Sequence, residues 1–147
     1  MNKIPKIIIV ISIIALIIIG IAFLTRKDEK DIELEEKMKE TDEMFNTWVS
    51  IASQSDKQYL QTNEKPIKAD INTKLNLDET KLLNAYSDAL SDLLSVKNTP
   101  LNPLFLTSSA YLISNFNKAK NVVSKTGIKD WFNKVAFSNL PNQNTTN

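Results

Sequence analysis

The chain contains no cysteine and no histidine among its 147 residues. The absence of cysteine excludes disulfides, thiol nucleophiles and thiolate metal ligands. The absence of histidine removes the commonest general base and the imidazole metal ligand. Only two glycines are present, too few for a phosphate-binding loop or a dinucleotide fingerprint. We therefore expect a protein that is not an enzyme and that binds no metal ion or cofactor.

Strong charge of either sign is also absent, because 18 Lys and Arg stand against 17 Asp and Glu. This balance does not favour a nucleic-acid partner. Proline is scarce, with five residues, and 42% of the residues are hydrophobic. A chain of this length fits about one domain. Together these values predict an all-α protein rather than a sheet protein.

The most prominent feature that is present is an uncharged run of eighteen residues, 7–24. As a helix it would be roughly 27 Å long, close to the thickness of a bilayer core. Lys3, Lys6 and Arg26 flank it. These features predict a transmembrane anchor that binds the lipid bilayer. A cleaved signal peptide is the alternative, although its apolar region would be shorter and Gly20–Ala22 is a poor cleavage site.

The basic tail 1–6 followed by an apolar run has the layout of an export signal. The segment 28–45 that follows carries nine acids and three lysines, which an anionic cytoplasmic leaflet would repel. We therefore expect the N-terminus in the cytoplasm and the rest of the chain outside it. The acids lack the spacing of a calcium loop, so we interpret them as a solvated helix face.

The first helix outside the anchor is predicted over 28–61, where no glycine or proline occurs. Its apolar face has helical spacing and consists of Met38, Thr41, Phe45, Trp48, Ala52, Ser55 and Tyr59. A second helix is predicted over 78–97, with two acids in its first turn. Its stripe consists of Leu82, Tyr86, Ala89, Leu90, Leu93 and Leu94.

A third helix is predicted over 103–125, with Asn102 as its cap and Pro103 at its first position. Gly127 is expected to end it in a left-handed conformation. A short fourth helix over 128–137 carries Ile128, Trp131, Phe132, Val135 and Ala136 on one face. The remaining residues, 138–147, are polar and are expected to form a disordered tail.

Residues 67–77 do not follow the helical pattern, since apolar and polar residues alternate strictly there apart from Thr73. Alternation is typical of a half-buried strand. The sequence offers no second strand as its partner, so we expect an extended connector across the helices. An edge that pairs with another chain is the alternative.

The C-terminal third is basic, with Lys118, Lys120, Lys125, Lys129 and Lys134 against Asp130 alone. Tryptophan beside lysines is typical of an interfacial element. The candidate residues for contact with a membrane or a partner are therefore Lys129, Trp131, Phe132 and Lys134. The apolar face is short, however, so we favour the interpretation that this helix closes the core with its rings and presents its lysines to solvent.

The predicted architecture is a tail (1–6), a transmembrane helix (7–24), a small antiparallel helical bundle (25–137) and a disordered tail (138–147). The expected centre of the core is Phe45, Trp48, Tyr86, Leu90, Leu93, Phe105, Leu112 and Phe116.

We interpret the chain as an interaction or accessory subunit of a membrane or cell-envelope complex, with protein partners. Two alternatives are an extracytoplasmic ligand-sensing domain and a hydrolase that uses only carboxylates or hydroxyls.

Overall fold

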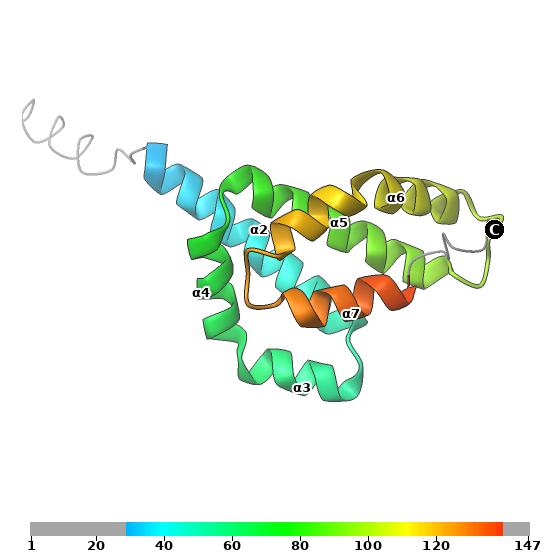
Figure 1. Cartoon of the computed structure of the whole chain (residues 1–147), viewed down its shortest axis with the longest axis horizontal. Helices are drawn as coiled ribbons and strands as arrows, with labels where there is room; N and C mark the ends of the chain where they lie inside the picture. Colours follow the sequence, from blue (N-terminus) through cyan, green and yellow to red (C-terminus); the bar gives the residue numbers. More distant parts are fainter. Residues whose placement is uncertain (1–28, 140–147) are drawn as a thin grey trace, which may run out of the picture. The chain divides into compact units, whose positions relative to one another are not determined.

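The computed structural model describes residues 29–139, in which six α-helices and no strand occur (Figure 1). The all-α prediction is confirmed for this part of the chain. The predicted tail 1–6 and anchor 7–24 lie outside the described residues, as do residues 140–147. Within residues 29–139, none of the helices combines the length and the apolar character that crossing a bilayer requires.

Contacts divide the chain after Glu33, and the described residues from Leu34 onward form one compact unit. The helices are α2 (Glu29–Ile51), α3 (Gln54–Thr62), α4 (Glu64–Lys74), α5 (Leu77–Val96), α6 (Pro103–Val123) and α7 (Lys129–Asn139). The last helix thus continues two residues beyond the predicted end at Phe137.

Helices α2 and α5 run in the same direction, so the predicted antiparallel arrangement is wrong for this pair. Residue numbers rise together along their contacts, which join Glu36 to Lys81, Glu40 to Asn84 and Thr47 to Asp88. The reason is that α3 and α4 carry the chain back to the beginning of α2 (Figure 1). There the ammonium of Lys37 donates to the carbonyl of Leu75 at 3.1 Å. Helix α4 runs antiparallel to α2, since Lys37, Thr41 and Asp42 contact Leu75, Asn72 and Lys68 in turn. Helices α5 and α6 form an antiparallel hairpin.

The prediction of one helix over 28–61 is wrong, because the helix stops at Ile51. Ser53 begins α3, and its hydroxyl accepts a hydrogen bond from the backbone N–H of Asp56 at 3.3 Å. A serine that caps a new helix thus interrupts a segment with no glycine or proline. Because the chain changes direction here, Leu60 is buried. Tyr59, which was expected on the buried face, is 48% exposed.

The prediction of an extended connector over 67–77 is also wrong, because residues 67–74 belong to α4. Ile67, Ile71 and Leu75 are buried at spacings of four, which one face of a helix also produces. Pro66 lies in the first turn, where its missing N–H costs nothing. The ammonium of Lys68 pairs with Asp42 of α2 at 3.1 Å. The same apolar positions therefore fit both periods, and packing selects the helix.

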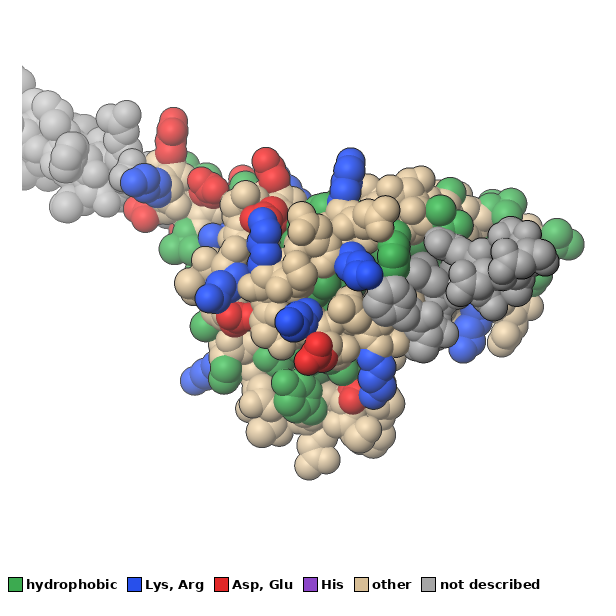
Figure 2. Space-filling view, viewed as in Figure 1, with side chains coloured by type: hydrophobic (Ala, Val, Ile, Leu, Met, Phe, Trp, Pro, Cys, Tyr) green, Lys and Arg blue, Asp and Glu red, His purple; other side chains and the backbone are tan. Residues whose placement is uncertain are grey.

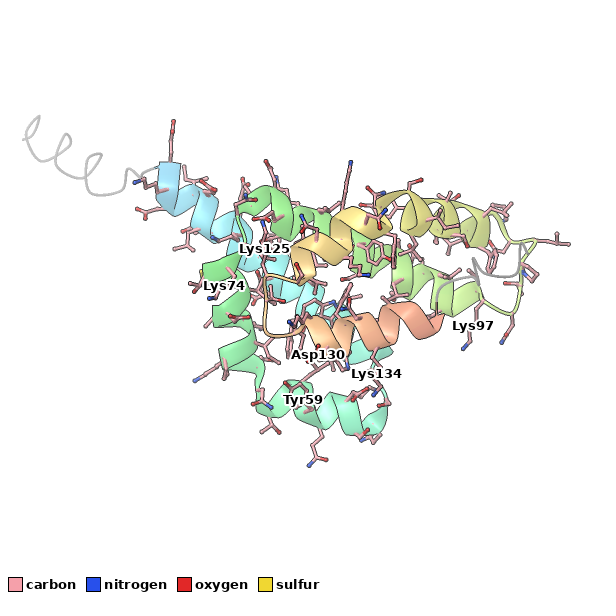
Figure 3. The ribbon with its side chains drawn as sticks, in the orientation of Figure 1. Tyr59, Lys74, Lys97, Lys125, Asp130 and Lys134 are labelled. Atoms are coloured by element: carbon pink, nitrogen blue, oxygen red, sulfur yellow. The ribbon has the colours of Figure 1, made fainter. Side chains whose placement is uncertain are left out.

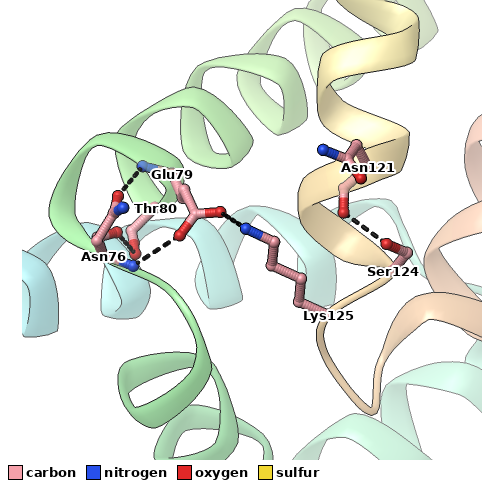
Figure 4. Close-up of polar contacts among 6 residues, drawn as sticks. All are labelled: Asn76, Glu79, Thr80, Asn121, Ser124 and Lys125. Atoms are coloured by element: carbon pink, nitrogen blue, oxygen red, sulfur yellow. Dashed lines mark hydrogen bonds and ion pairs between the residues drawn. The ribbon is translucent and has the colours of Figure 1, made fainter.

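Helix α5 begins at Leu77, one residue before the predicted start, and has the two predicted acids in its first turn. Asn76 and Glu79 also form a reciprocal capping box, which was not predicted (Figure 4). The N–H of Glu79 donates to Asn76 Oδ1 at 2.8 Å, and the N–H of Asn76 donates to Glu79 Oε1 at 3.1 Å. Lys125, after α6, pairs with the same carboxylate. The hydrogen bond from Lys125 and the N–H of Asn76 lower the pKa of Glu79.

Helix α6 begins as predicted and ends differently. Asn102 caps it by accepting from the N–H of Leu104 at 2.9 Å, and Pro103 is its first residue. Its C-cap is Ser124 in a right-handed conformation, and no residue between 29 and 139 has a positive φ. Gly127 therefore forms no left-handed cap, and the prediction is wrong on this point. The chain instead leaves the helix through the turn 124–128.

The core is centred on four aromatic side chains from α2, α5 and α7. The Trp48 ring lies 5.7 Å from Trp131 and 5.9 Å from Phe132, and Tyr86 lies 6.0 Å from Phe132. The indole N–H of Trp48 donates to Ser87 Oγ at 2.8 Å. The prediction that Phe105 and Phe116 lie at the centre of the core is wrong, because both are only half-buried at its edge. The other six are buried, and they are Phe45, Trp48, Tyr86, Leu90, Leu93 and Leu112.

Candidate functional site

The four predicted contact residues separate into two buried rings and two exposed lysines. Trp131 is 8% exposed and Phe132 is 3% exposed, and both pack on Trp48. Lys129 and Lys134 are exposed, and Lys134 pairs with Asp56 of α3 at 3.5 Å. The rings are therefore part of the core of the folded domain, and only the lysines lie on its surface.

The amphipathic pattern of α7 explains this placement. All five residues of its predicted apolar face are buried, namely Ile128, Trp131, Phe132, Val135 and Ala136. Because α7 covers the open side of α2 and α5, its apolar face is already occupied. The favoured interpretation, in which this helix closes the core, is confirmed for its rings. Figure 3 shows the polar side of α7, with Lys134 and Asp130 toward Tyr59 of α3.

Large exposed apolar side chains instead gather on the α5–α6 hairpin. Leu101 in the turn is 93% exposed, and Leu104, Leu106 and Ile113 on α6 are 39%, 61% and 49% exposed. We call these four residues the hairpin surface. Figure 2 shows hydrophobic side chains at this end of the domain. Large apolar side chains are also exposed on α2, at Ile32, Leu34 and Met38, but those of the hairpin surface fall in a segment without charge. Exposed apolar side chains without charged neighbours indicate a site of contact with another molecule.

The hairpin surface exists because α6 is apolar on two sides. One side, including Leu112, Ala119 and Val123, is buried against the rest of the domain. Leu106, Ala110 and Ile113 are spaced at four and three residues, so they form a second stripe that is exposed. The twenty residues 98–117 contain no charged side chain. This segment, which is the turn and the first fifteen residues of α6, thus lacks the charged side chains that usually cover a solvated helix face.

Sequence reasoning missed the hairpin surface, although two signals for it were present. The first is the absence of charge over 98–117. The second is that Leu106 and Ile113 fall outside the stripe of Leu112 and Ala119. A helix that is apolar on two sides is expected to bury both of them against neighbours.

Apart from the hairpin surface, the domain has a hollow between α3, α4 and the turn before α7. It has a volume of about 190 Å³ and is lined by Tyr59, Asn63, Pro66, Ile67, Asp70, Gly127 and Ile128. We call it the Asp70 hollow. The N–H of Gly127 donates to Asp70 Oδ2 at 2.6 Å and holds the carboxylate against the turn. A Cβ at position 127 would lie 3.4 Å from that oxygen, so glycine leaves this approach free of side-chain contact.

Carboxylates also gather between α2 and α5, around the buried amide of Asn84. The amide nitrogen donates to Glu40 at 2.5 Å and approaches Glu43 at 3.4 Å. Burial, with repulsion from Asp92, Glu43 and Glu40, raises the pKa of Asp88 against the effect of its hydrogen bond from Thr47. No group of three or more acidic residues in the described part of the chain has the geometry to hold a metal ion. Glu40 and Glu43 therefore accept hydrogen bonds from the Asn84 amide, and their charges help to raise the pKa of Asp88.

The surface charges pair across the domain in a pattern that the sequence did not predict. The acidic α2 pairs with α4 and α5, through Asp42 with Lys68 and Glu36 with Lys81. The basic C-terminal third pairs with α3 and α5, through Lys134 and Lys125. None of these four ion pairs includes a residue of the hairpin surface or of the Asp70 hollow.

No protein-family model matches the chain, and comparisons with curated proteins and with solved structures also find no match.

Proposed function

We propose that the protein is a non-enzymatic, membrane-anchored interaction subunit of a membrane or cell-envelope complex. Residues 7–24 anchor it, the N-terminus is cytoplasmic, and the helical domain is extracytoplasmic. The observation that carries the proposal is the hairpin surface, on which Leu101, Leu104, Leu106 and Ile113 are exposed within an uncharged segment. Depletion of charge together with exposed large apolar side chains is typical of the centre of a protein–protein interface.

The partner on this surface is an apolar face of another protein rather than a lipid surface. Binding to anionic lipid uses clusters of Lys and Arg, whereas Lys97 is the only charged residue between Asp92 and Lys118. A partner helix that packs along Leu106, Ala110 and Ile113 would cover the exposed stripe and leave the charged faces of the domain in water.

The test is the composition of the complex that carries the full chain when it is purified from its native membranes in mild detergent. We expect a stoichiometric hetero-complex, measured by light scattering and native mass spectrometry. Leu106→Asp with Ile113→Asp should release the partner because a charge would be buried in the interface. The matched control is Lys118→Asp, which changes charge on another side of α6 and should keep the complex. A lone monomer or a homodimer contradicts the proposal.

The anchor has its own test. The mature protein should retain residues 1–24 and stay with membranes after carbonate washing, because the apolar run is long and its cleavage site is poor. A mature N-terminus at Phe23, measured by mass spectrometry, contradicts the anchor and leaves the hairpin surface unaffected.

A further inference from the structure

We propose that the Asp70 hollow binds an arginine side chain presented by a partner polypeptide. The hollow brings one carboxylate, one exposed aromatic ring and an apolar floor to the same small space (Figure 3 labels Tyr59). It lies on α3, α4 and the turn before α7, away from the four residues of the hairpin surface. The proposal therefore does not rest on the proposed function.

The charge of Asp70 is the first argument. Its side chain is partly buried, and no ion pair within residues 29–139 involves it. By contrast, Asp42, Asp56 and Glu79 each have a lysine partner. Lys74 is one turn later on α4 and stays exposed. A carboxylate accepts several hydrogen bonds, and the N–H of Gly127 is the one donor in the described structure. The remaining acceptor positions suit a cationic donor.

The walls of the hollow favour arginine among the cations. Tyr59 exposes 48% of its surface, and Ile67 and Ile128 form a buried floor. A guanidinium is planar and weakly hydrated, so it stacks on an aromatic ring while it pairs with a carboxylate. Its methylene stem covers apolar surface. The ammonium of lysine is a compact, strongly hydrated charge and uses the ring less well.

The size of the hollow limits the occupant to one side chain. A volume of about 190 Å³ is below the roughly 300–1,000 Å³ of small-molecule and cofactor pockets. A single long side chain fills this space, and a nucleotide does not.

The experiment titrates the ¹⁵N-labelled full chain in a non-ionic detergent with N-acetyl-arginine amide, which carries only the guanidinium charge. The reporter is the amide resonance of Gly127, because this N–H is bonded to Asp70. We expect a saturable shift of the Gly127 resonance. N-acetyl-lysine amide should bind more weakly, and N-acetyl-norleucine amide should produce no shift.

Two variants test the roles of the residues. Asp70→Asn keeps an acceptor for Gly127 but removes the charge, and it should abolish the shift. Tyr59→Ala should weaken binding about twofold to fivefold, the effect of one exposed cation–π contact. Tyr59 is exposed, so this variant stays informative if Asp70→Asn fails to fold. The matched control is Asp92→Asn, an exposed carboxylate on α5 that does not line the hollow. Equal binding of the three amides, or full binding to Asp70→Asn, overturns the proposal.

Discussion

Helices α6 and α7 both carry strong apolar faces, and they differ in what covers them. The face of α7, with Trp131 and Phe132, packs on Trp48 and Tyr86 and completes the core. Helix α6 packs along α5 on one side and leaves Leu106 and Ile113 exposed on another. A short helix can hide its whole apolar face beneath neighbours. A helix that is apolar on two sides needs a second neighbour, which the described domain does not supply.

The largest expected effect separates the two faces directly. Phe132→Ala should lower the free energy of unfolding by about 3–5 kcal/mol, because it leaves a cavity beside the rings of Trp48 and Tyr86. Leu106→Ala should lower it by less than about 0.5 kcal/mol, since that side chain is 61% exposed. The measurement is urea denaturation of the full chain in detergent, followed by far-UV circular dichroism. Equal losses would contradict the difference between α6 and α7.

A second prediction compares the buried and the exposed side of α6 at two neighbouring residues. Leu112 is fully buried and Ile113 is 49% exposed. Leu112→Ala should cost about 2–5 kcal/mol of unfolding free energy, and Ile113→Ala less than about 1 kcal/mol. Phe116 is half-buried at the edge and should fall between them. The same denaturation experiment checks this order, and a larger loss for Ile113→Ala would show that the buried side of α6 is assigned incorrectly.

The third prediction concerns the side of the core formed by α5. Burial raises the pKa of Tyr86 to about 12, from 10.0 for an exposed phenol. The unfolded state therefore loses its proton first, and stability should fall by about 2–3 kcal/mol as the pH rises from 10 to 12. Tyr86→Phe should remove this contribution and keep the fold, because the buried hydroxyl has no hydrogen-bond partner in the described structure. Urea denaturation across an alkaline pH series is the measurement, and an unchanged alkaline loss in the variant contradicts the assignment.

A smaller effect compares two carboxylates of α5. The pKa of Glu79 is lowered by its hydrogen bonds with Lys125 and Asn76, so its stabilising effect is present above the unfolded pKa near 4.5. That effect is lost as the pH falls through the lower folded value. Glu79→Gln should cost about 1 kcal/mol at neutral pH. The pKa of Asp88 is raised by burial and by its acidic neighbours, so Asp88→Asn should not destabilise the domain. Denaturation at pH 7 and at pH 4 measures the free energy of unfolding of both variants, and only Glu79→Gln should lower it at pH 7.

The smallest expected effect is that of salt on folding. The ion pairs are on the surface and join elements within one chain, and each contributes about 0–1 kcal/mol. The unfolding midpoint should therefore change little between low and high salt, and Lys118→Ala should not change it. A complex held by the hairpin surface should also persist at high salt. Dissociation on adding salt, measured by sedimentation, would indicate an interface made by Lys129 and Lys134 instead.

Several elements could be predicted because their signals are local. Asn102 and Pro103 at the start of α6, and the acids Asp78 and Glu79 in the first turn of α5, act within one turn of the chain. The face of α7 was identified because its apolar residues have only the helical period. The break at Ser53 was missed because a serine is compatible with both a helix interior and a cap. The segment 67–77 was misassigned because Ile67, Ile71 and Leu75 fit periods of two and of four.

By itself the sequence determined the helical class of residues 29–139, the starts of α5 and α6, and the inner face of α7. These properties depend on backbone hydrogen bonds and on spacing along a single helix. Only the tertiary structure decided the parallel course of α2 and α5, the rings on which Trp131 and Phe132 pack, and the exposure of Leu106 and Ile113. It also brought Tyr59, Asp70 and Gly127 together in one hollow. These properties depend on which helix covers which face, and the free energy of burial depends on apolar area without specifying the partner that covers it.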